Sequence, residues 1–383
     1  MLHSPYDFVF RMKELFSLMQ DEKSQALFWD RLRCDVYPSI HYTADLYAHA
    51  FDLSEEEHKK QLQLEQQAEK LHQSGKKLLL YGAGGTGHKI AEMFRMKEIP
   101  FAGFCDCRAE SLQEVQGKPV YSPDYLFSHI DECYVIVTAV MYFNEILDVL
   151  KSHKFPDDHI LNYFTGSLLC PDGEQYFAFP QYFPEGTAFV DGGCFDGMTS
   201  LHFSKWCHGK YSKILAFEPD AGSAEICEQF VEKHQIRDFT LFRAGLSKSN
   251  GVGQFIACGA GNSYFDDCTK NENFLYNREE TGHASTETKL LALDEVTADT
   301  RVGFIKMDIE GFELDALQGG EQTIKRDKPL LAICVYHRAG DVLAIMDYLH
   351  EIVPEYRFWL RHYTATPLET VLYAAVPGTS EKG

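Results

Sequence analysis

The chain has 383 residues, 45% of them hydrophobic, which is enough to bury the cores of two domains. Its formal net charge of −21 argues against nucleic acid and against an anionic membrane as partners, because either would meet a repulsive field. The 11 cysteines include no Cys-x-x-Cys pair, and no segment reaches the roughly 20 apolar residues of a membrane span. We therefore expect a protein of the reducing cytoplasm.

Residues 1–75 are predicted to form a helical segment. Apolar residues recur at three- and four-residue intervals from Phe8 to Met19, as on a helix that packs against another element. Residues 40–51 are again apolar and helical in pattern, and Gly75 ends the last polar helix. We interpret this segment as a structural cap or a dimerisation element, which leaves a homodimer open.

Residues 76–163 are predicted to form a small Rossmann-like α/β domain. A buried strand ends at Tyr81, the run Gly82-Ala83-Gly84-Gly85-Thr86-Gly87 fits Gly-x-Gly-x-x-Gly, and Asp106 ends the next strand, where a ribose-binding acid would lie. Only about one mononucleotide half is present, so we favour a substrate nucleotide such as a sugar nucleotide over NAD. A scaffold with an empty loop is an equal alternative. The candidate residues of this second nucleotide site are Gly82, Gly84, Gly85, Gly87 and Asp106.

Residues 164–186 read as a linker that contains Pro, Gly and many aromatic residues, such as Tyr176 and Phe177. A flexible tether would be polar and rich in Gly and Ser. We therefore expect this linker to pack on a domain surface.

Residues 187–383 begin with a strand that passes through three glycines into a helix, a layout in which the backbone can approach a ligand closely. The spacing is Asp191-x-Gly193-x-x-x-Gly197, and an acid at the strand end suits a cation better than a pyrophosphate. S-adenosylmethionine carries an ammonium and a sulfonium group. Glu218, at the tip of the next strand, is placed to accept hydrogen bonds from both ribose hydroxyls. The candidate donor-binding residues are Asp191, Gly192, Gly193, Phe195, Asp196, Gly197, Thr199, Glu218, Pro219, Gly245 and Leu246.

Strands and helices alternate through the rest of this domain, as in a doubly wound sheet. The last two strands, 357–363 and 370–376, have no helix between them and must pair as an antiparallel hairpin at one sheet edge. Parallel strands followed by such a hairpin are the layout of class I methyltransferases. Residues 247–296 form an insertion with extra strands, for which we expect Phe255 to pair with Leu291. Its length suggests a lid or substrate loop, although a peripheral hairpin is also open.

Acidic residues follow the fourth predicted strand of this domain. Asp308 lies at its carboxyl end, which faces the ligand crevice, and Glu310 is the next acid outward. His337 follows the fifth strand and opens on the same crevice. Two interpretations are equally supported: Asp308, Glu310 and His337 bind a divalent cation, or Lys306 neutralises these acids in a structural ion-pair network. We assign no metal site.

Six motifs in this order resemble the FkbM-type methyltransferase family over about residues 175–376. They are Asp-x-Gly-x-x-x-Gly from Asp191, Phe217-Glu218-Pro219-Asp220, Leu293-Asp294-Glu295, Lys306-x-Asp308-x-Glu310-Gly311-x-Glu313, Tyr336-His337 and Arg361-His362-Tyr363. The resemblance implies a class I Rossmann-like fold, S-adenosylmethionine as cofactor, and methylation of a hydroxyl on a sugar, a glycosylated compound or a secondary metabolite. It implies donor-binding roles for Asp191, Gly193, Gly197 and Glu218. Residues 76–163 resemble sugar-nucleotide-binding domains.

Methyl transfer to oxygen requires alignment and a proton acceptor. We hypothesise that Asp308 or His337 is the base and that Glu310 orients a small-molecule acceptor or binds a cation; Arg361 and His362 could line the acceptor site. Two alternatives are an NAD-dependent sugar-nucleotide oxidoreductase that uses residues 82–87 and a non-catalytic S-adenosylmethionine-binding protein.

Overall fold

The computed structural model describes residues 5–36, 40–52, 64–96, 99–139, 142–161, 175–256, 264–265, 285–364 and 367–378. The chain divides into two compact units. The larger unit comprises Met1–Val36, Cys170–Tyr363 and Pro367–Gly383, and the smaller unit comprises Tyr37–Leu169 and Thr364–Thr366. Among the described residues, no helix combines the length and the apolar character that crossing a bilayer requires.

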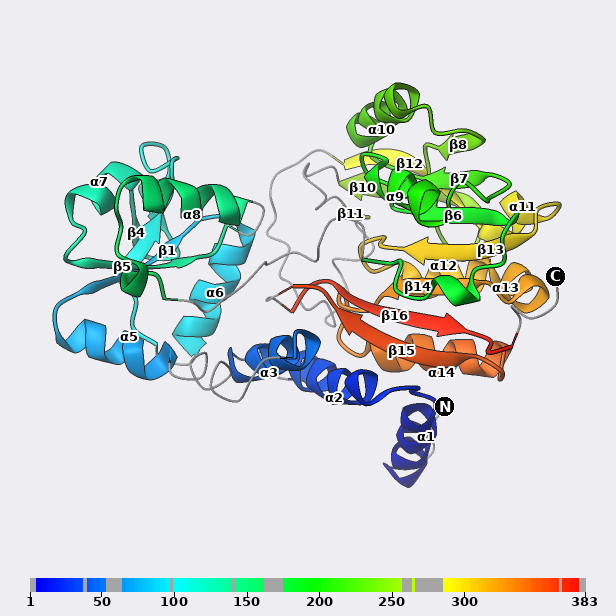
Figure 1. The fold of residues 1–383 in the computed structure, drawn as a ribbon, viewed down its shortest axis with the longest axis horizontal. Helices are drawn as coiled ribbons and strands as arrows, with labels where there is room; N and C mark the ends of the chain where they lie inside the picture. Colours follow the sequence, from blue (N-terminus) through cyan, green and yellow to red (C-terminus); the bar gives the residue numbers. More distant parts are fainter. Residues whose placement is uncertain are drawn as a thin grey trace. The chain divides into compact units, whose positions relative to one another are not determined.

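A seven-stranded sheet forms the centre of the larger unit, in the order β15-β16-β14-β13-β6-β7-β8 (Figure 1). The strands are β6 (Ala188–Gly192), β7 (Ile214–Phe217), β8 (Phe239–Phe242), β13 (Val302–Met307), β14 (Leu330–Cys334), β15 (Arg357–His362) and β16 (Thr370–Ala375). The run from β14 to β8 is parallel, and β16 is antiparallel to both of its neighbours. The predicted terminal hairpin at the sheet edge is confirmed.

Helices connect the parallel strands of this sheet, which gives the doubly wound arrangement of a class I methyltransferase fold. They are α9 (Met198–Trp206), α10 (Ala221–His234), α11 (Leu293–Thr297), α12 (Glu313–Gly319), α13 (Glu321–Asp327) and α14 (Asp341–Ile352). The start of α10 illustrates how the sequence sets these boundaries. Asp220 caps the helix by accepting a 2.8 Å hydrogen bond from the Ser223 backbone N–H, and Gln235 ends it in the left-handed conformation.

The first two helices, α1 (Pro5–Ser17) and α2 (Glu22–Val36), belong to this larger unit. Between them, Gln20 N–H donates to the Phe358 carbonyl at 3.0 Å, and Phe358 N–H donates to the Leu18 carbonyl at 3.1 Å. This short addition covers the outer edge of β15, where unpaired backbone groups would otherwise be exposed. The unit boundary therefore does not follow the predicted helical segment 1–75, because α2 packs on β15.

The described part of the predicted aromatic linker, from residue 175 on, lies in the core of the larger unit. Phe177, Phe179 and Phe183 are buried in the same cluster as Phe203 and Phe304. The ring of Phe177 meets that of Phe304 edge-on with 5.9 Å between centroids. These residues are thus core-forming; residues 164–174 lie outside the described residues.

The predicted insertion carries a four-stranded sheet in the order β11-β10-β12-β9. Its strands are β9 (Gly245–Leu246), β10 (Gly251–Ile256), β11 (Tyr264–Phe265) and β12 (Ser285–Leu291). Within it, β10 pairs with β12 so that Phe255 faces Thr286 and Gly251 faces Leu290. The expected pairing of Phe255 with Leu291 was therefore wrong in register. Because β10 and β12 are antiparallel, the end of β12 near Leu291 lies opposite the start of β10 at Gly251, and Phe255 lies near the other end.

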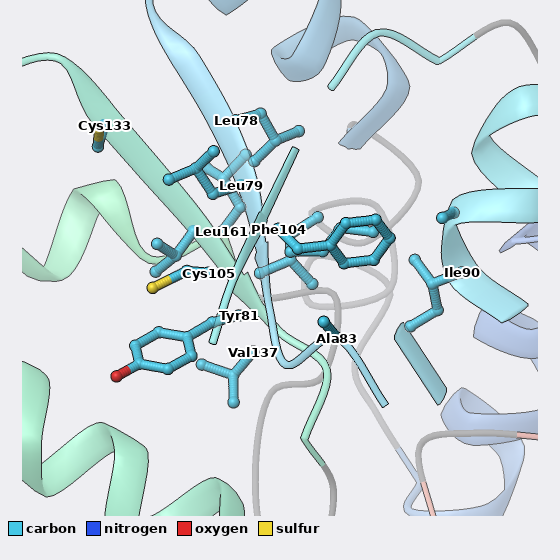
Figure 2. Packing of buried hydrophobic residues seen from close by; sticks show 14 of the residues in the cluster. Leu78, Leu79, Tyr81, Ala83, Ile90, Phe104, Cys105, Cys133, Val137 and Leu161 are labelled. Atoms are coloured by element: carbon cyan, nitrogen blue, oxygen red, sulfur yellow. The ribbon is translucent and has the colours of Figure 1, made fainter. Parts of the chain in front are cut away.

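The smaller unit has a five-stranded sheet in the order β3-β4-β2-β1-β5. Its elements are α3 (Ile40–Ala50), α5 (Leu64–Gln73), β1 (Lys77–Tyr81), α6 (Gly85–Met96), β2 (Gly103–Cys105), β3 (Glu114–Val115), β4 (Lys118–Tyr121), α7 (Pro123–Ser128), β5 (Cys133–Val137) and α8 (Phe143–Ser152). Figure 2 shows side chains of β1, β2 and β5, among them Leu79, Phe104 and Val137, in the core of this unit, with Ile90 of α6 nearby. The parallel pairing of β1 with both β2 and β5 matches the predicted Rossmann-like pattern.

Candidate active site

Asp191 and Lys306 form a buried ion pair beneath the glycine loop. The parallel register places them on facing positions of β6 and β13, with 3.3 Å between Lys306 Nζ and Asp191 Oδ1. Ser200 Oγ donates to Asp191 Oδ2 at 2.7 Å, and Lys306 Nζ donates to the carbonyls of Gly192 and Gly193. Asp191 has no exposed surface. Its carboxylate therefore supports the loop from below, and the donor-binding role expected of it stays a prediction.

The glycine loop runs directly over the end of β13. Gly193 has φ +73°, and a Cβ added there would lie 2.0 Å from the Asp308 carbonyl oxygen, so only glycine fits. Phe195 also has positive φ and is exposed, and Gly197, with φ +83°, precedes α9. Asp196 Oδ1 accepts a 2.9 Å hydrogen bond from the Met198 N–H at the start of that helix. The predicted loop is confirmed as a close turn of backbone from β6 into α9.

Glu218 lies at the end of β7, beside this loop. Its Oε2 accepts from Phe195 N–H at 3.0 Å and its Oε1 accepts from Asp220 N–H at 2.8 Å. Burial raises the pKa of Glu218 to about 7. Each carboxylate oxygen has two lone pairs, so Glu218 keeps acceptor capacity for hydroxyl groups after these two bonds. The geometry fits the ribose-binding role predicted for it.

The other predicted donor residues lie around the same strand ends. Gly245 and Leu246 are buried in β9, and Leu246 Cδ1 would lie 3.2 Å from a Cβ on Gly192. Pro219 follows β7, and Thr199 is the second residue of α9; both are partly exposed. The structure thus brings the predicted set to the carboxyl ends of β6 and β7.

Four charged side chains gather where β13 and β14 end, and we call them the acid–histidine cluster: Asp308, Glu310, Glu313 and His337. His337 Nε2 lies 3.5 Å from Asp308 Oδ1 and 3.8 Å from Glu310 Oε2, while Nδ1 lies 2.9 Å from Glu313 Oε1. The backbone N–H of Ile309 donates to Glu313 Oε1 at 2.9 Å. The three predicted catalytic residues, Asp308, Glu310 and His337, are therefore neighbours.

The charges of this cluster are strongly coupled. Although burial opposes a charged imidazole, the carboxylates of Glu313, Glu310 and Asp308 raise the pKa of His337 to about 10. Burial also opposes the charge on Asp308, yet His337 and Lys306 lower the pKa of its carboxyl group. Without a metal ion at this cluster, His337 is therefore a cation and Asp308 an anion at neutral pH.

Two tyrosines hold the carboxylate of Asp308, and neither was singled out from the sequence as a site residue. Tyr176 OH donates to Asp308 Oδ2 at 2.8 Å and Tyr336 OH donates to Oδ1 at 3.0 Å. Tyr336 OH also lies 3.4 Å from Glu369 Oε1, and Gln175 donates to Oε2 of the same residue. The adjacency of Tyr336 to His337 was a usable signal, whereas Tyr176 and Glu369 carry no motif. Both come from distant parts of the chain.

Arg361 and His362 lie outside the acid–histidine cluster. Arg361 donates to Asp21 Oδ2 at 2.8 Å, and a nitrogen of the buried His362 ring lies 2.9 Å from Thr370 Oγ1. Arg361 therefore ties α2 to β15, which corrects the suggestion that it lines the acceptor site.

Residues of the second predicted nucleotide site lie together in the smaller unit, and nucleotide binding there stays a prediction. Gly82 has φ +124° and would clash with Ala139 if it carried a Cβ, and a Cβ on Gly87 would lie 2.0 Å from the Gly82 carbonyl oxygen. Asp106 Oδ2 accepts from Ala83 N–H at 2.8 Å, and Oδ1 accepts from the Arg108 N–H and guanidinium. Despite the opposing effect of burial, Arg108 lowers the pKa of Asp106 to about 2. The glycine loop and Asp106 are in contact as predicted, but Arg108 is hydrogen-bonded to the Asp106 carboxylate.

Comparisons with known proteins bear on the larger unit. Residues 193–360 match the family model described as the methyltransferase FkbM domain. "Methyltransferase 1" of Beauveria bassiana (strain ARSEF 2860) is 30% identical over 152 residues, which are 36% of this chain and 59% of that relative. The chain therefore spans less than two thirds of this curated relative's length.

Similar solved structures include methyltransferase FkbM from Methylobacillus flagellatus KT, at 19% identity and a TM-score of 0.49 over 78% of this chain and 90% of that chain. An rRNA methylase from Streptococcus thermophilus has 12% identity and a TM-score of 0.33 over 52% of this chain and 93% of its own. Residues 193–360 are therefore similar to the methyltransferase FkbM domain, and the glycine loop and the sheet order of the larger unit agree with this similarity.

Proposed function

We propose that this protein transfers a methyl group from S-adenosylmethionine to a hydroxyl oxygen of a small-molecule acceptor, such as a sugar, a glycosylated compound or a secondary metabolite. The observation that supports this best is the contact between the glycine loop and the acid–histidine cluster. Asp308 N–H donates to the Gly192 carbonyl at 3.1 Å, and Gly193 passes against the Asp308 carbonyl. A donor cradle and a set of proton acceptors therefore adjoin each other.

The residues around β6 and β7 fit such a donor. The turn at Gly193 has no room for a Cβ because the Asp308 carbonyl lies against it, which holds the glycine loop close to the end of β13. Glu218 offers acceptor lone pairs to ribose hydroxyls, while Phe195 N–H holds the carboxylate against the loop. S-adenosylmethionine, when bound, supplies a methyl group on a positively charged sulfur.

The acid–histidine cluster supplies the acceptor side. A hydroxyl oxygen must lose its proton as it forms the new bond to carbon, and carboxylates at the strand ends can accept that proton. Asp308 and Glu310 are the partly exposed acids of the cluster, with 22% and 28% of their side chains exposed, whereas Glu313 and His337 are buried. We therefore assign the acceptor contacts to Asp308 and Glu310. The tyrosines Tyr176 and Tyr336 hold Asp308 in place.

The alternative of an NAD-dependent oxidoreductase draws less support from the contacts of the smaller unit. The acid that would bind a ribose there, Asp106, is engaged by Ala83 and Arg108. Among the described residues no cationic side chain forms a salt bridge with Glu218, whose carboxylate oxygens accept from the backbone N–H groups of Phe195 and Asp220.

The donor site is tested by isothermal titration calorimetry with S-adenosylhomocysteine on the wild type and on Glu218→Gln. A hydrogen bond to a charged group contributes about 1.5–3 kcal/mol, so we expect affinity to fall by roughly 10- to 100-fold. The control is Glu228→Gln on α10, an exposed carboxylate paired with Arg243, which should bind like the wild type. Equal affinity in Glu218→Gln and wild type would contradict the donor site.

Catalysis is tested by mass spectrometry with a panel of hydroxylated acceptors in the presence of S-adenosylmethionine. We expect a methylated product and an equal amount of S-adenosylhomocysteine from at least one sugar or secondary-metabolite alcohol. Tight donor binding without product from any acceptor would favour the non-catalytic alternative.

A further inference from the structure

His337 is a buried histidine whose ring points into a group of carboxylates. It is 3% exposed; Nδ1 lies 2.9 Å from Glu313 Oε1, whereas Nε2 has no hydrogen-bond partner in the described part of the chain. Such a buried polar side chain is costly unless something satisfies it. Glu313, which lies against Nδ1 and is 1% exposed, likewise has an Oε2 with no hydrogen-bond partner among the described residues.

The separations around Nε2 match a bridging cation better than direct hydrogen bonds. Asp308 Oδ1 and Glu310 Oε2 lie 3.5 and 3.8 Å from Nε2, which is beyond the range of an N–H···O bond. Two ligand atoms that each lie about 2.1 Å from one cation are separated from each other by about 3–4 Å. Each of these two oxygens thus lies at the distance from Nε2 that two ligands of one cation would have.

We propose that Asp308, Glu310 and His337 bind one divalent cation at the carboxyl ends of β13 and β14. Glu313 orients the imidazole through Nδ1, as carboxylates do for many metal-bound histidines, and Ile309 N–H in turn holds Glu313. Glu313 is also near enough to contribute directly. Asp308, Glu313 and His337 each offer one ligand atom, and these three atoms all lie within 4.8 Å of one another.

The donor set indicates which cation binds. Two or three carboxylates with one imidazole favour hard to intermediate ions such as Mg²⁺ and Mn²⁺ over thiolate-seeking metals. A cation there lowers the pKa of a hydroxyl group that coordinates it. Cation binding stands on the cluster geometry alone, whereas this role in activating the acceptor rests on the proposed methyl transfer.

The test uses Mn²⁺ as the probe, with the full-length protein after treatment with a chelator and without donor. The free Mn²⁺ signal in electron paramagnetic resonance should reveal one saturable site per chain, and Mg²⁺ should compete for it. Glu310→Gln should weaken Mn²⁺ binding at least tenfold. The matched control is Glu321→Gln, a carboxylate at the start of α13 that pairs with Lys325, and its Mn²⁺ affinity should equal that of the wild type.

The partly exposed Glu310 is chosen because its loss should leave the fold intact, which circular dichroism and an unchanged affinity for S-adenosylhomocysteine would verify. Absence of saturable Mn²⁺ binding by the wild type up to about 1 mM, the weak end for oxygen-ligand sites, would overturn the proposal. Equal Mn²⁺ affinity in Glu310→Gln and wild type would also overturn it. Donor binding is measured separately, so failure of the donor site and failure of the cation site give different results.

Discussion

Lys306 and Asp191 face each other on neighbouring parallel strands, and their side chains form an ion pair of 3.3 Å that is 2% and 0% exposed. The lysine also donates to the carbonyls of Gly192 and Gly193, so one ammonium group joins the strand end to the glycine loop. The motif acid of the first strand and the motif lysine of the fourth are therefore one structural unit.

This pair leads to a prediction about stability. Asp191→Asn should lower the free energy of unfolding by about 3–5 kcal/mol, because it leaves Lys306 buried without its counter-charge. Urea denaturation followed by circular dichroism measures the change. The control is Lys210→Met, which removes an exposed pair with Glu185 and should cost at most about 1 kcal/mol. Similar costs for the two variants would show that Lys306 finds another partner.

A second prediction concerns the glycine turn. Gly193→Ala should cost stability and weaken the binding of S-adenosylhomocysteine, because its Cβ would meet the Asp308 carbonyl at 2.0 Å. Gly186→Ala is the matched control: it also has positive φ but no atom within 4 Å, so only the backbone penalty of about 1–2 kcal/mol remains. Calorimetry and urea denaturation compare the two. Unchanged donor affinity in Gly193→Ala would argue against a donor role for this turn.

The third prediction is a pH dependence. Burial raises the pKa of Glu218 to about 7, so below this pH the folded protein carries a neutral carboxyl group there. If the carboxylate accepts the ribose hydroxyls, affinity for S-adenosylhomocysteine should rise between pH 6 and pH 8. Calorimetry at several pH values measures this. Glu218→Gln should lose this dependence, and a rise of the same size in that variant would assign the effect to another group.

Glu218 also affects the stability of the fold, and this effect has the opposite pH dependence from the effect on donor affinity. Between its ordinary value of 4.5 and about 7, Glu218 binds a proton in the folded chain but not in the unfolded chain. Its contribution to the free energy of unfolding should therefore fall as pH rises through this window. Urea denaturation of wild type and Glu218→Gln at pH 5 and pH 8 isolates this contribution; a parallel pH response of both proteins would rule it out.

A fourth prediction concerns the tyrosine that holds Asp308. Tyr176→Phe removes the 2.8 Å hydrogen bond to Oδ2, and we expect the rate of methyl transfer to fall about tenfold or more while donor affinity stays unchanged. Tyr356→Phe is the control, because its hydroxyl bonds the Pro329 carbonyl, at the opposite end of β14 from the cluster. It should lose about 1 kcal/mol of stability and keep the wild-type rate. A rate loss shared equally by both variants would indicate a general effect on packing.

Several features of this protein could be predicted from local sequence. The turn from β6 into α9 is marked by Gly193 and Gly197, because positive φ and close backbone contacts leave few alternatives to glycine. Glu218 was predicted because strand ends in a parallel sheet meet at one edge, and the terminal hairpin followed from the missing helix between β15 and β16. Asp308, Glu310 and His337 were grouped for the same topological reason.

Other features depended on contacts between residues far apart in the chain. Asp191 was predicted to face the donor, but the register of β6 against β13 pairs it with Lys306. Tyr176 was assigned to a linker, yet it reaches Asp308. The amino-terminal helices were predicted to form a separate segment, but Met19, between α1 and α2, pairs with Phe358 of β15.

The sequence by itself therefore determined the succession of strands and helices along the larger unit, the glycine turn and the residue types of the acid–histidine cluster, because backbone conformation and hydrophobic pattern are local properties. Only the tertiary structure decided which carboxylate is buried with Lys306, which tyrosines hold Asp308, and how closely His337 approaches its acids. Those partners come from separate elements, and side-chain pairing across strands is set by register and packing, which no short stretch of sequence encodes.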